Sequence, residues 1–383
     1  MSSGDFSYPD QLPNGPAHRR GAGLNPGNRF ESFRLHVLGE ELDRREAERD
    51  PELSADHLPR VEREVIPDAT RTIINKVDPL SDVPFGYTLN PYRGCEHGCI
   101  YCFARPYHEY LGFSCGLDFE TKIMAKHDAP ALLRKELAAP KWAGEPIVMS
   151  AITDVYQPLE HELRLTRQCL EILTECEQPT GTMTKGALIL RDLDLWQKLC
   201  HRGVGRVTVT LVTLDAELAK KLEPRATLPA GRLRIIRELT AAGIDVSVNV
   251  APVIPGLTDR EVPHVLEAVA DAGAKHAIWV TLRLPWQLKA LFTEWLARHT
   301  PPEQARHVES LLRQAHNGKL YDASDAARRR GRGVLADNLA TVFDAFRRRY
   351  KLDQPFPPMR RDRFRKPFAG GQMALFSDPG LAT

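Results

Sequence analysis

The sequence predicts an α/β protein: a partial (β/α)6 barrel followed by a helical, basic C-terminal extension. The first observation is that, from about residue 85 to residue 285, short apolar segments alternate with segments of helical periodicity. The second is that about six such units can be counted, fewer than the eight of a closed barrel. Repeated alternation with short turns favours parallel strands covered by helices, with ligands at the carboxyl ends of the strands. A doubly wound sheet is the alternative arrangement.

Order is expected to begin near Val65, because residues 1 to about 60 are rich in Gly, Pro and charged side chains. Apolar residues at helical spacing, such as Leu132, Leu133 and Leu137, predict the first helix. Short apolar runs between such segments predict the strands. The ordered chain is expected to lead through 87–90 to the cysteine loop, and the first half of the barrel to have strands at 146–152 and 181–185 and helices at 126–138, 160–176 and 190–200.

The second half of the barrel has clearer boundaries. Alternating apolar and polar residues over 206–212 predict a strand. Asp215 can cap the helix that follows, and Pro229 opens a further helix that Gly243 closes. The remaining strands are expected at 245–251 and 276–282, and the remaining helices at 261–272, 286–299, 302–315 and 334–350.

The bulk composition is that of a globular protein in a reducing compartment. The 383 residues carry a formal net charge of +2, and no apolar run approaches the length of a membrane span. The N-terminal residues lack the hydrophobic core of a signal peptide. Seven cysteines at irregular spacing do not form the pattern of a disulfide framework. We therefore expect a cytoplasmic protein.

Positive charge concentrates near the C-terminus, where residues 328–366 hold 13 Lys and Arg against 4 Asp and Glu. Such a stretch would attract phosphate backbones, so nucleic acid is an expected partner. A solvated helix face followed by a basic tail would explain the same composition. Together with the barrel, this division predicts a weakly structured N-terminal segment, a barrel core, a helical C-terminal region and a basic flexible tail, at residues 1–64, 65–285, 286–355 and 356–383.

Three cysteines are the most informative feature of the chain. Cys95, Cys99 and Cys102 lie within eight residues, and Tyr101 directly precedes the third. Cubane iron–sulfur clusters are ordinarily held by four cysteines, so three ligands leave one iron open to an outside molecule. An open coordination site on a redox cluster indicates catalysis rather than electron storage.

Two other ligand sets are compatible with the same loop. Zinc could bind the three cysteines together with His97 or His108, although zinc ligands usually come as two separated pairs. Cys115, thirteen residues after Cys102, could serve as a fourth ligand of a cluster.

The spacing C-x3-C-x2-C with an aromatic residue before the last cysteine resembles the signature of the radical S-adenosylmethionine superfamily. The resemblance implies that Cys95, Cys99 and Cys102 hold a 4Fe-4S cluster whose open iron binds S-adenosylmethionine, while Tyr101 lies against the adenine. It implies reductive cleavage of the sulfonium to a 5′-deoxyadenosyl radical, which abstracts hydrogen from a substrate. An electron donor such as flavodoxin or ferredoxin would be a partner. The family fold is a partial (β/α)6 barrel, in agreement with the strand count.

The segment from Ser150 to Glu160 resembles the second-strand motif of the branch related to spore photoproduct lyase, commonly labelled DNA repair photolyase. Within it, Thr153 and Asp154 offer oxygens that can accept hydrogen bonds from the ammonium group of the methionine moiety. Asp154 could instead cap the following helix.

Further segments resemble the same branch, and the resemblance as a whole covers about residues 80–285. Thr184 and Lys185 match its third-strand region, where Lys185 could contact a carboxylate or phosphate or be a surface lysine. Residues 249–259 match the region around strand five, where polar groups meet ribose in enzymes of this kind. Asn249 is the expected ribose contact.

Two departures separate the chain from spore photoproduct lyase itself. In that enzyme a downstream cysteine donates hydrogen to the product radical, helped by tyrosines around the third cluster cysteine. Here Phe103 follows Cys102, and no cysteine lies between Cys115 and Cys169. Repair of the spore thymine lesion is therefore not expected, and no residue is assigned a catalytic role.

The expected function is a radical enzyme that acts on a nucleic acid, in DNA repair or modification, with lyase-like chemistry. The same radical could act on a protein or a small molecule. A third hypothesis is that the protein is not an enzyme but a zinc-stabilised nucleic-acid-binding module. Near the C-terminal end, Gln372 to Phe376 resembles the Gln-x-x-Leu-Phe peptide by which bacterial DNA enzymes dock on the sliding clamp, which adds the clamp to the expected partners.

Overall fold

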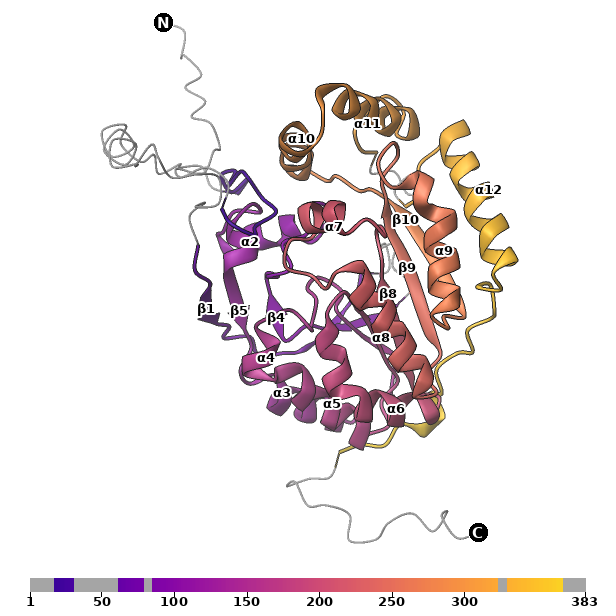
Figure 1. The fold of residues 1–383 in the computed structure, drawn as a ribbon. Helices are drawn as coiled ribbons and strands as arrows, with labels where there is room; N and C mark the ends of the chain where they lie inside the picture. The colour runs from indigo at the N-terminus through magenta and orange to yellow at the C-terminus, as the bar shows by residue number, and fades with distance from the viewer. Residues whose placement is uncertain (1–16, 31–60, 79–84, 323–328, 368–383) are drawn as a thin grey trace, which may run out of the picture.

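Parallel strands form the centre of the molecule and confirm the partial (β/α)6 barrel. The computed structural model describes residues 17–30, 61–78, 85–322 and 329–367 (Figure 1). Its main sheet has the order β10-β9-β8-β7-β6-β3-β2, in which neighbouring strands are parallel except for β2 and β3. The strands are β2 (Ile74–Lys76), β3 (Tyr87–Leu89), β6 (Ile147–Met149), β7 (Thr180–Thr184), β8 (Gly205–Thr210), β9 (Val246–Val253) and β10 (His276–Thr281).

Helices between successive strands cover the outside of this sheet (Figure 1). The Asp215 carboxylate accepts hydrogen bonds from the backbone N–H groups of Glu217 and Leu218, which confirms it as the N-cap of α7. The helix expected over 160–176 is divided at Arg164, which has a φ of 53°. The covering helices are α3 (Ala129–Ala138), α4 (Glu160–Leu163), α5 (Leu165–Glu175), η3 (Ala187–Asp192), α6 (Leu193–His201), α7 (Ala216–Leu222), α8 (Pro229–Ala241), η4 (Asp259–Glu261) and α9 (Val262–Asp271).

The two faces of the sheet differ in character. On β9, Val246, Val248 and Val250 belong to the large apolar core shared with the covering helices. Ser247 and Asn249 alternate with them and therefore point to the other face. We call the helix-covered side the outer face and the opposite side the inner face. The inner face is thus polar where the outer face is apolar.

A second, small sheet carries the cysteine loop. It has the order β1-β5-β4, with β1 (Glu64–Pro67), β5 (Lys122–Ala125) and β4 (Tyr92–Arg93). The sequence predicted a helix from residue 126, but β5 pairs with β1 just before it, and α3 begins at Ala129. Between β4 and β5 the chain forms the cysteine loop, η2 (Arg105–Leu111) and α2 (Asp118–Thr121).

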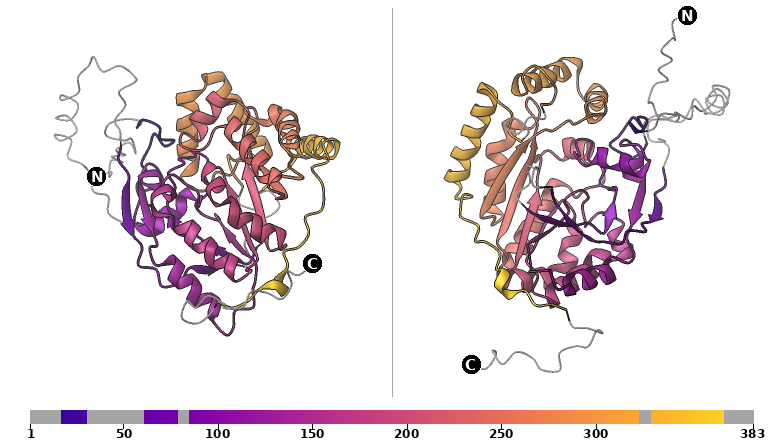
Figure 2. Two further views of the ribbon diagram at one scale, coloured as in Figure 1. Left: turned by 60° about the horizontal axis from the view of Figure 1, so that its bottom comes forward. Right: turned by 180° about the vertical axis from the view of Figure 1, so that it is seen from behind.

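Three helices follow the barrel, as expected: α10 (Leu288–His299), α11 (Pro302–Ala315) and α12 (Val334–Arg349). From α12 the chain runs down one side of the barrel to its bottom (Figures 1 and 2). There the Phe356 ring stacks on His276, with 3.9 Å between ring centroids, and lies 4.1 Å from the Arg206 guanidinium carbon. The first part of the expected flexible tail, including η5 (Arg361–Arg363), is therefore packed on the amino ends of the strands.

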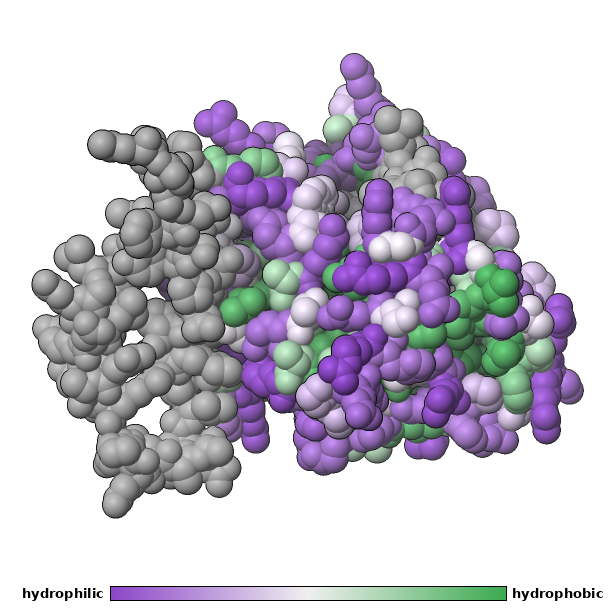
Figure 3. All heavy atoms as spheres, turned by 90° about the horizontal axis from the view of Figure 1, so that it is seen from above, coloured by the Kyte–Doolittle hydropathy of each residue, from purple (hydrophilic) through white to green (hydrophobic). Residues whose placement is uncertain are grey.

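None of the described helices has the length and apolar character needed to cross a membrane. Seen from above, the molecule is mostly hydrophilic, and apolar side chains gather on the side away from the grey residues (Figure 3). The expected clamp-binding peptide, Gln372 to Phe376, lies outside the described residues. The four expected region boundaries stay predictions, although residues 17–30 of the first region pack beside the cysteine loop.

Candidate active site

The cysteine loop is a series of tight turns. Backbone N–H groups of Gly98, Cys102 and Arg105 each donate to the carbonyl three residues earlier, at 3.4, 3.2 and 3.1 Å. Gly94 and Gly98 have φ angles of 80° and 67°, a region in which a side chain is strained. A Cβ on Gly98 would also lie 2.7 Å from a Glu120 carboxylate oxygen. The turns therefore depend on glycine at these positions.

These turns bring the three predicted ligands together. Cys95 and Cys99 are buried and Cys102 is half-buried. Burial raises the pKa of the Cys99 thiol, and the nearby Cys102 and Cys95 raise it further while Lys185 lowers it. Three thiols close enough to affect one another electrostatically fit a group that supplies compensating positive charge, such as an iron–sulfur cluster.

Among the described residues, no group of three or more His, Cys, Asp or Glu side chains meets the geometry of a site for one metal ion. Of the two histidines in the zinc alternative, His97 faces Asp154, with 3.3 Å between Nδ1 and Oδ2, and His108 packs against Phe113 and Phe119. Both histidines thus lie against other protein groups, and zinc binding by the cysteine loop stays a prediction.

A fully buried arginine, Arg105, contacts the backbone of the cysteine loop. The Arg105 guanidinium donates to the carbonyls of Gly98, Cys99, Cys115 and Gly116 and forms an ion pair with Glu120 at 2.6 Å. The backbone carbonyl of Cys115 is thus one of the acceptors that fix Arg105. Since a buried charge is tolerated only when it is well paired, Arg105 and Glu120 hold the loop in one conformation.

Residues near the N-terminus complete the loop's cover. Backbone N–H groups of Gly21 and Ala22 donate to the two Glu120 oxygens at 2.9 and 2.8 Å. A Cβ on Gly21 would lie 2.0 Å from the Gly98 carbonyl oxygen, so the two backbones touch. Arg298 on α10 donates to the Gly21 carbonyl at 3.0 Å. This contact was not predicted from the sequence, since no local pattern signals a pairing over such a distance in the chain.

Thr153 and Asp154 lie next to the cysteine loop, in the chain that follows β6. Thr153 donates its hydroxyl to the Gly94 carbonyl at 2.7 Å. Asp154 accepts hydrogen bonds from the Thr184 hydroxyl at 2.7 Å and from the backbone N–H groups of Lys185 and Tyr156 at 2.8 and 2.9 Å. It is not a helix N-cap, because α4 begins at Glu160 with Leu159 as its N-cap.

The Asp154 carboxylate accepts three hydrogen bonds, from Thr184, Lys185 and Tyr156, so about one of its four lone-pair positions is left. Burial opposes its charge, but His97 and the Lys185 backbone hold the pKa of Asp154 well below its usual range. Burial would lower the pKa of His97, yet Asp154 outweighs it and raises that pKa to about 9. A direct contact of Asp154 with a ligand ammonium stays a prediction.

Tyr101 belongs to a buried charged group. Its hydroxyl donates to Glu223, which forms an ion pair with Arg232 of α8. The Lys185 ammonium lies 5.9 Å from the centroid of the Tyr101 ring. The expected contact of Tyr101 with adenine is not tested, but Glu223 and Arg232 fix the ring beside Cys99 and Cys102. Neither residue was given a role from the sequence, although both lay in a segment that resembled the branch.

Asn249 lies on the inner face of β9, paired in register with Thr210 of β8 and Ile278 of β10. It is buried, and within the described residues its side chain makes a weak contact from Nδ2 to the Met183 sulfur at 3.3 Å. The Asn249 Oδ1 and Thr210 Oγ1 atoms are buried without hydrogen-bond partners. Because buried polar atoms are normally paired, the two neighbouring atoms fit a polar ligand inside the barrel. The ribose contact itself stays a prediction.

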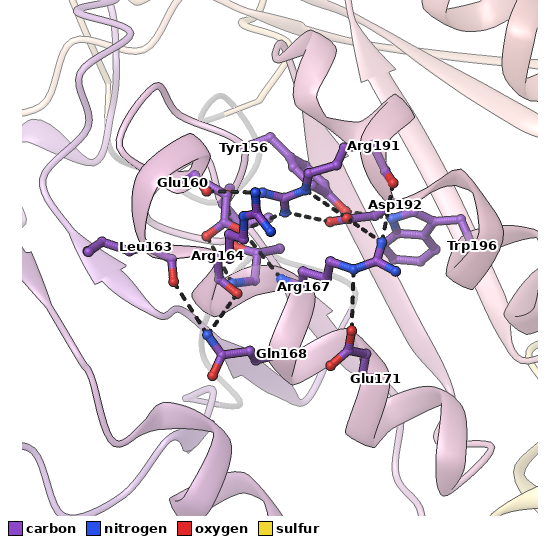
Figure 4. A network of polar contacts seen from close by, with 12 residues as sticks. Tyr156, Glu160, Leu163, Arg164, Arg167, Gln168, Glu171, Arg191, Asp192 and Trp196 are labelled. Atoms are coloured by element: carbon purple, nitrogen blue, oxygen red, sulfur yellow. Dashed lines mark hydrogen bonds and ion pairs between the residues drawn. The ribbon is translucent and has the colours of Figure 1, made fainter.

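A buried polar network joins the second-strand and third-strand motifs behind the site (Figure 4). Glu160 is fully buried and accepts hydrogen bonds from the Tyr92 hydroxyl and from Arg191, at 2.5 and 2.6 Å. Arg167 and Arg191 both contact Asp192, at 3.0 and 2.8 Å. The network therefore fixes the chain that follows Asp154 and the chain that follows Lys185.

The fold and the site define a class: an enzyme with a partial parallel barrel whose cysteine loop lies at the carboxyl ends of the strands. A family model described as the radical SAM superfamily matches residues 89–269, and the chain belongs to this superfamily. An uncharacterized protein of Mycobacterium tuberculosis (strain ATCC 25618 / H37Rv) is 39% identical over 245 residues, 63% of this chain and 72% of that protein.

Two further similarities place the chain near enzymes of different kinds. A radical SAM Nalpha-GlyT isomerase of Pseudomonas phage M6 is 24% identical over 231 residues, 60% of this chain and 46% of that protein. The structure of spore photoproduct lyase complexed with dinucleoside spore photoproduct has a TM-score of 0.54 at 16% identity, over 75% of this chain and 79% of that chain. The fold is therefore that of spore photoproduct lyase, while the sequence is of a related branch.

Proposed function

We propose that this enzyme holds a 4Fe-4S cluster through Cys95, Cys99 and Cys102, binds S-adenosylmethionine beside it, and acts on a nucleic acid. The observation that carries the proposal is the gathering of three thiols beside a polar inner face with unpaired buried atoms. When bound, the cluster and S-adenosylmethionine would supply a 5′-deoxyadenosyl radical by one-electron cleavage of a sulfonium C–S bond, with methionine as the other product.

The chain's own residues would position S-adenosylmethionine. Asn249 can hydrogen-bond a ribose hydroxyl through its unpaired Oδ1. Tyr101 offers a ring fixed by Glu223, against which adenine can lie. Lys185, half-buried near the Tyr101 ring, can pair with the methionine carboxylate. Asp154 and Thr153 would accept hydrogen bonds from the ammonium group of the methionine moiety, or would position the neighbouring loops that accept them.

The nucleic-acid target has support of two kinds. The solved structure with the same fold is described as a complex with a dinucleoside spore photoproduct. The chain also keeps a run of three arginines, Arg347 to Arg349, at the end of α12, where Arg348 and Arg349 are exposed. The basic residues that follow α12 contribute less where they are paired, since Arg361 and Arg363 form ion pairs with Glu145 and Glu177 on the barrel.

Anaerobic purification tests the cofactors. We expect about four irons per chain, as a single cubane requires, and formation of 5′-deoxyadenosine from S-adenosylmethionine under reducing conditions. Cys99→Ser should lose both, whereas Cys115→Ser and Cys200→Ser should keep the iron. A colourless protein with one zinc per chain would contradict the proposal.

Deuterium transfer tests the target. Nucleic acid, and separately a mixture of proteins and metabolites, would be isolated from cells grown on deuterated nutrients. Each fraction would then be incubated with the reduced enzyme and S-adenosylmethionine. Deuterium in 5′-deoxyadenosine from the nucleic acid alone would support the proposal, because the radical takes hydrogen from its substrate. Transfer from the protein or metabolite fraction alone would overturn the nucleic-acid target and leave the radical chemistry intact.

A further inference from the structure

Exposed aromatic rings gather beside the cysteine loop. Among the described residues, the Phe, Tyr and Trp side chains classed as exposed are Phe30, Phe103, Tyr107, Tyr110 and Trp286, with exposed fractions between 40% and 65%. Phe103, Tyr107 and Tyr110 follow the third cysteine directly in the chain. We call this set of five the aromatic rim. Large apolar side chains that remain exposed together indicate a binding surface.

The rim is held together by one buried carboxylate. Glu109 accepts hydrogen bonds from the Arg29 backbone N–H at 3.1 Å and from Gln287 at 2.6 Å. Its second oxygen lies 3.4 Å from Arg29 Nε. The N-terminal segment, η2 and the chain after β10 therefore meet at Glu109, so the rim is a fixed feature built from three parts of the sequence.

Arginine is interleaved with the rings. The Arg29 guanidinium carbon lies 4.6, 5.6 and 4.2 Å from the ring centroids of Phe30, Tyr110 and Trp286. That of Arg283 lies 5.3 Å from the Phe103 ring. Flat rings with guanidinium groups between them suit a ligand that has both aromatic faces and negative charge.

The spacing of two tyrosines suits a stacked base. Tyr107 and Tyr110 are three residues apart in the 3-10 helix η2, in which side chains at that spacing line up. Their ring centroids are 6.3 Å apart and their planes 35° from parallel. Stacked bases repeat at about 3.4 Å, so a base between two rings needs about 6.8 Å. A small rotation of either ring would therefore admit one base.

A pocket opens behind the same two rings. It has a volume of about 240 Å³ and is lined by Gly94, Ala104, Tyr107, His108 and Tyr110 together with neighbouring side chains. The His108 side chain is 2% exposed, and its Nε2 has no hydrogen-bond partner. The pocket is therefore the size of a small heterocycle and offers it one polar atom, next to the backbone that carries the cysteines.

We propose that the aromatic rim binds unpaired nucleobases, and so holds a single-stranded or locally opened nucleic acid against the mouth of the cysteine site. This inference rests on the nucleic-acid target proposed above and specifies that the nucleic acid is bound with unpaired bases. Base chemistry inside a duplex requires the base to leave the stack, and an aromatic surface beside the site stabilises the base once it has left. Stacking accepts every base, whereas the arginines attract the backbone.

Binding of labelled oligonucleotides to the full-length, cluster-containing protein tests this. The probe is a single-stranded 20-mer of mixed sequence, compared with its duplex, by fluorescence anisotropy under anaerobic conditions. Tyr107→Ala/Tyr110→Ala should weaken single-strand binding about tenfold or more and leave the slope of affinity against salt unchanged. Tyr107→Phe/Tyr110→Phe keeps both rings and should bind within twofold of wild type. Val334→Ala, at a 77% exposed apolar residue of α12, is the matched control.

Each outcome decides between the two proposals. Equal binding of single strand by the wild type and the double-alanine variant, with iron content and thermal stability unchanged, would overturn the aromatic rim as the base-binding surface. The same equal binding is expected if the aromatic rim instead binds a protein partner. A wild-type protein that binds neither single strand nor duplex would overturn the nucleic-acid target itself.

Discussion

The outer and inner faces of the central sheet are built from alternate residues of the same strands, yet they do different work. On the outer face of β9, Val246, Val248 and Val250 are buried in the core beneath the helices. On the inner face, Asn249 keeps an oxygen without a partner, and Ile278 beside it is 48% exposed. The outer face is packed mainly by the protein's own apolar side chains, whereas the inner face keeps polar groups that we propose a ligand contacts. Successive side chains of a strand point to opposite faces, so alternate residues of one strand can contribute separately to stability and to the proposed ligand site.

The largest expected effect comes from a buried side chain that links α8 to the candidate site. Arg232 extends from α8 to the Thr210 carbonyl and to Glu223, which holds Tyr101. Arg232→Met should lower the free energy of unfolding by about 3–5 kcal/mol, because it leaves the buried Glu223 charge without its partner.

Chemical denaturation of the variant measures that loss, and S-adenosylmethionine binding should weaken with it. Arg234→Met on the same helix is the control, since Arg234 is exposed and its pair with Glu238 should contribute less than about 0.5 kcal/mol. Similar losses for both variants would mean that the buried pair has no special role.

Two adjacent residues of β9 give the sharpest test of the comparison. Val248→Ala should cost about 2 kcal/mol of stability, from two lost methyl groups and the cavity they leave, with little change in ligand affinity. Asn249→Ala should change stability by less than about 1 kcal/mol and weaken S-adenosylmethionine binding, since its oxygen has no partner in the protein. Thermal unfolding and anaerobic calorimetric titration measure the two quantities. The reverse pattern would break the separation of the faces.

A histidine beside the cysteine loop extends the comparison to pH. Burial lowers the pKa of His108 to about 4, below the ordinary value of 6.5. The folded protein therefore favours the neutral ring, and the stability this gives is present above pH 6.5 and is lost as the pH falls towards 4. Between pH 7 and pH 5 the loss should be about 2 kcal/mol relative to His108→Phe, which keeps a ring against Phe113 and Phe119. Parallel slopes of urea-derived stability against pH in the two proteins would refute this.

The smallest expected effect concerns the closed end of the inner face. Phe356 covers Arg206 and His276 at the amino ends of the strands. Phe356→Ala should cost about 1 kcal/mol, from one ring stack and a half-buried side chain, and should leave ligand affinity unchanged. Differential scanning calorimetry measures this cost. A large loss of affinity instead would show that the inner face acts as a unit from end to end.

The fold was predictable wherever periodicity is strong. The strands of the second half and the helices α9, α11 and α12 lie within two residues of the expected positions, since each carries a regular apolar pattern. The small sheet was missed because β1, β4 and β5 are only two to four residues long and show no alternation. The packing of Phe356 was missed because a single aromatic residue in a basic, proline-rich segment carries no such pattern.

The three cysteines of the candidate site were predictable because their chemistry depends on local spacing. The contacts that hold the cysteine loop in place were not predictable, since the partners of Glu120 lie near residue 21 and at Arg105. The partners of Asp154 likewise come from the end of β7, from the loop after β6 and, as the ion-pair neighbour His97, from the cysteine loop. Such contacts are fixed by the topology of the barrel, which brings distant carboxyl ends of strands to one edge.

The contact of Gly21 with both the cysteine loop and α10 has a consequence for how the protein is made. The ribosome delivers residue 21 first, the cysteines next and Arg298 much later, and N-terminal parts of a chain generally fold first. The cover over the cysteine loop can therefore form fully only after α10 has emerged. Until then the three thiols lack part of the cover that they have in the folded protein, and the cluster proposed above would reach them most directly in that interval.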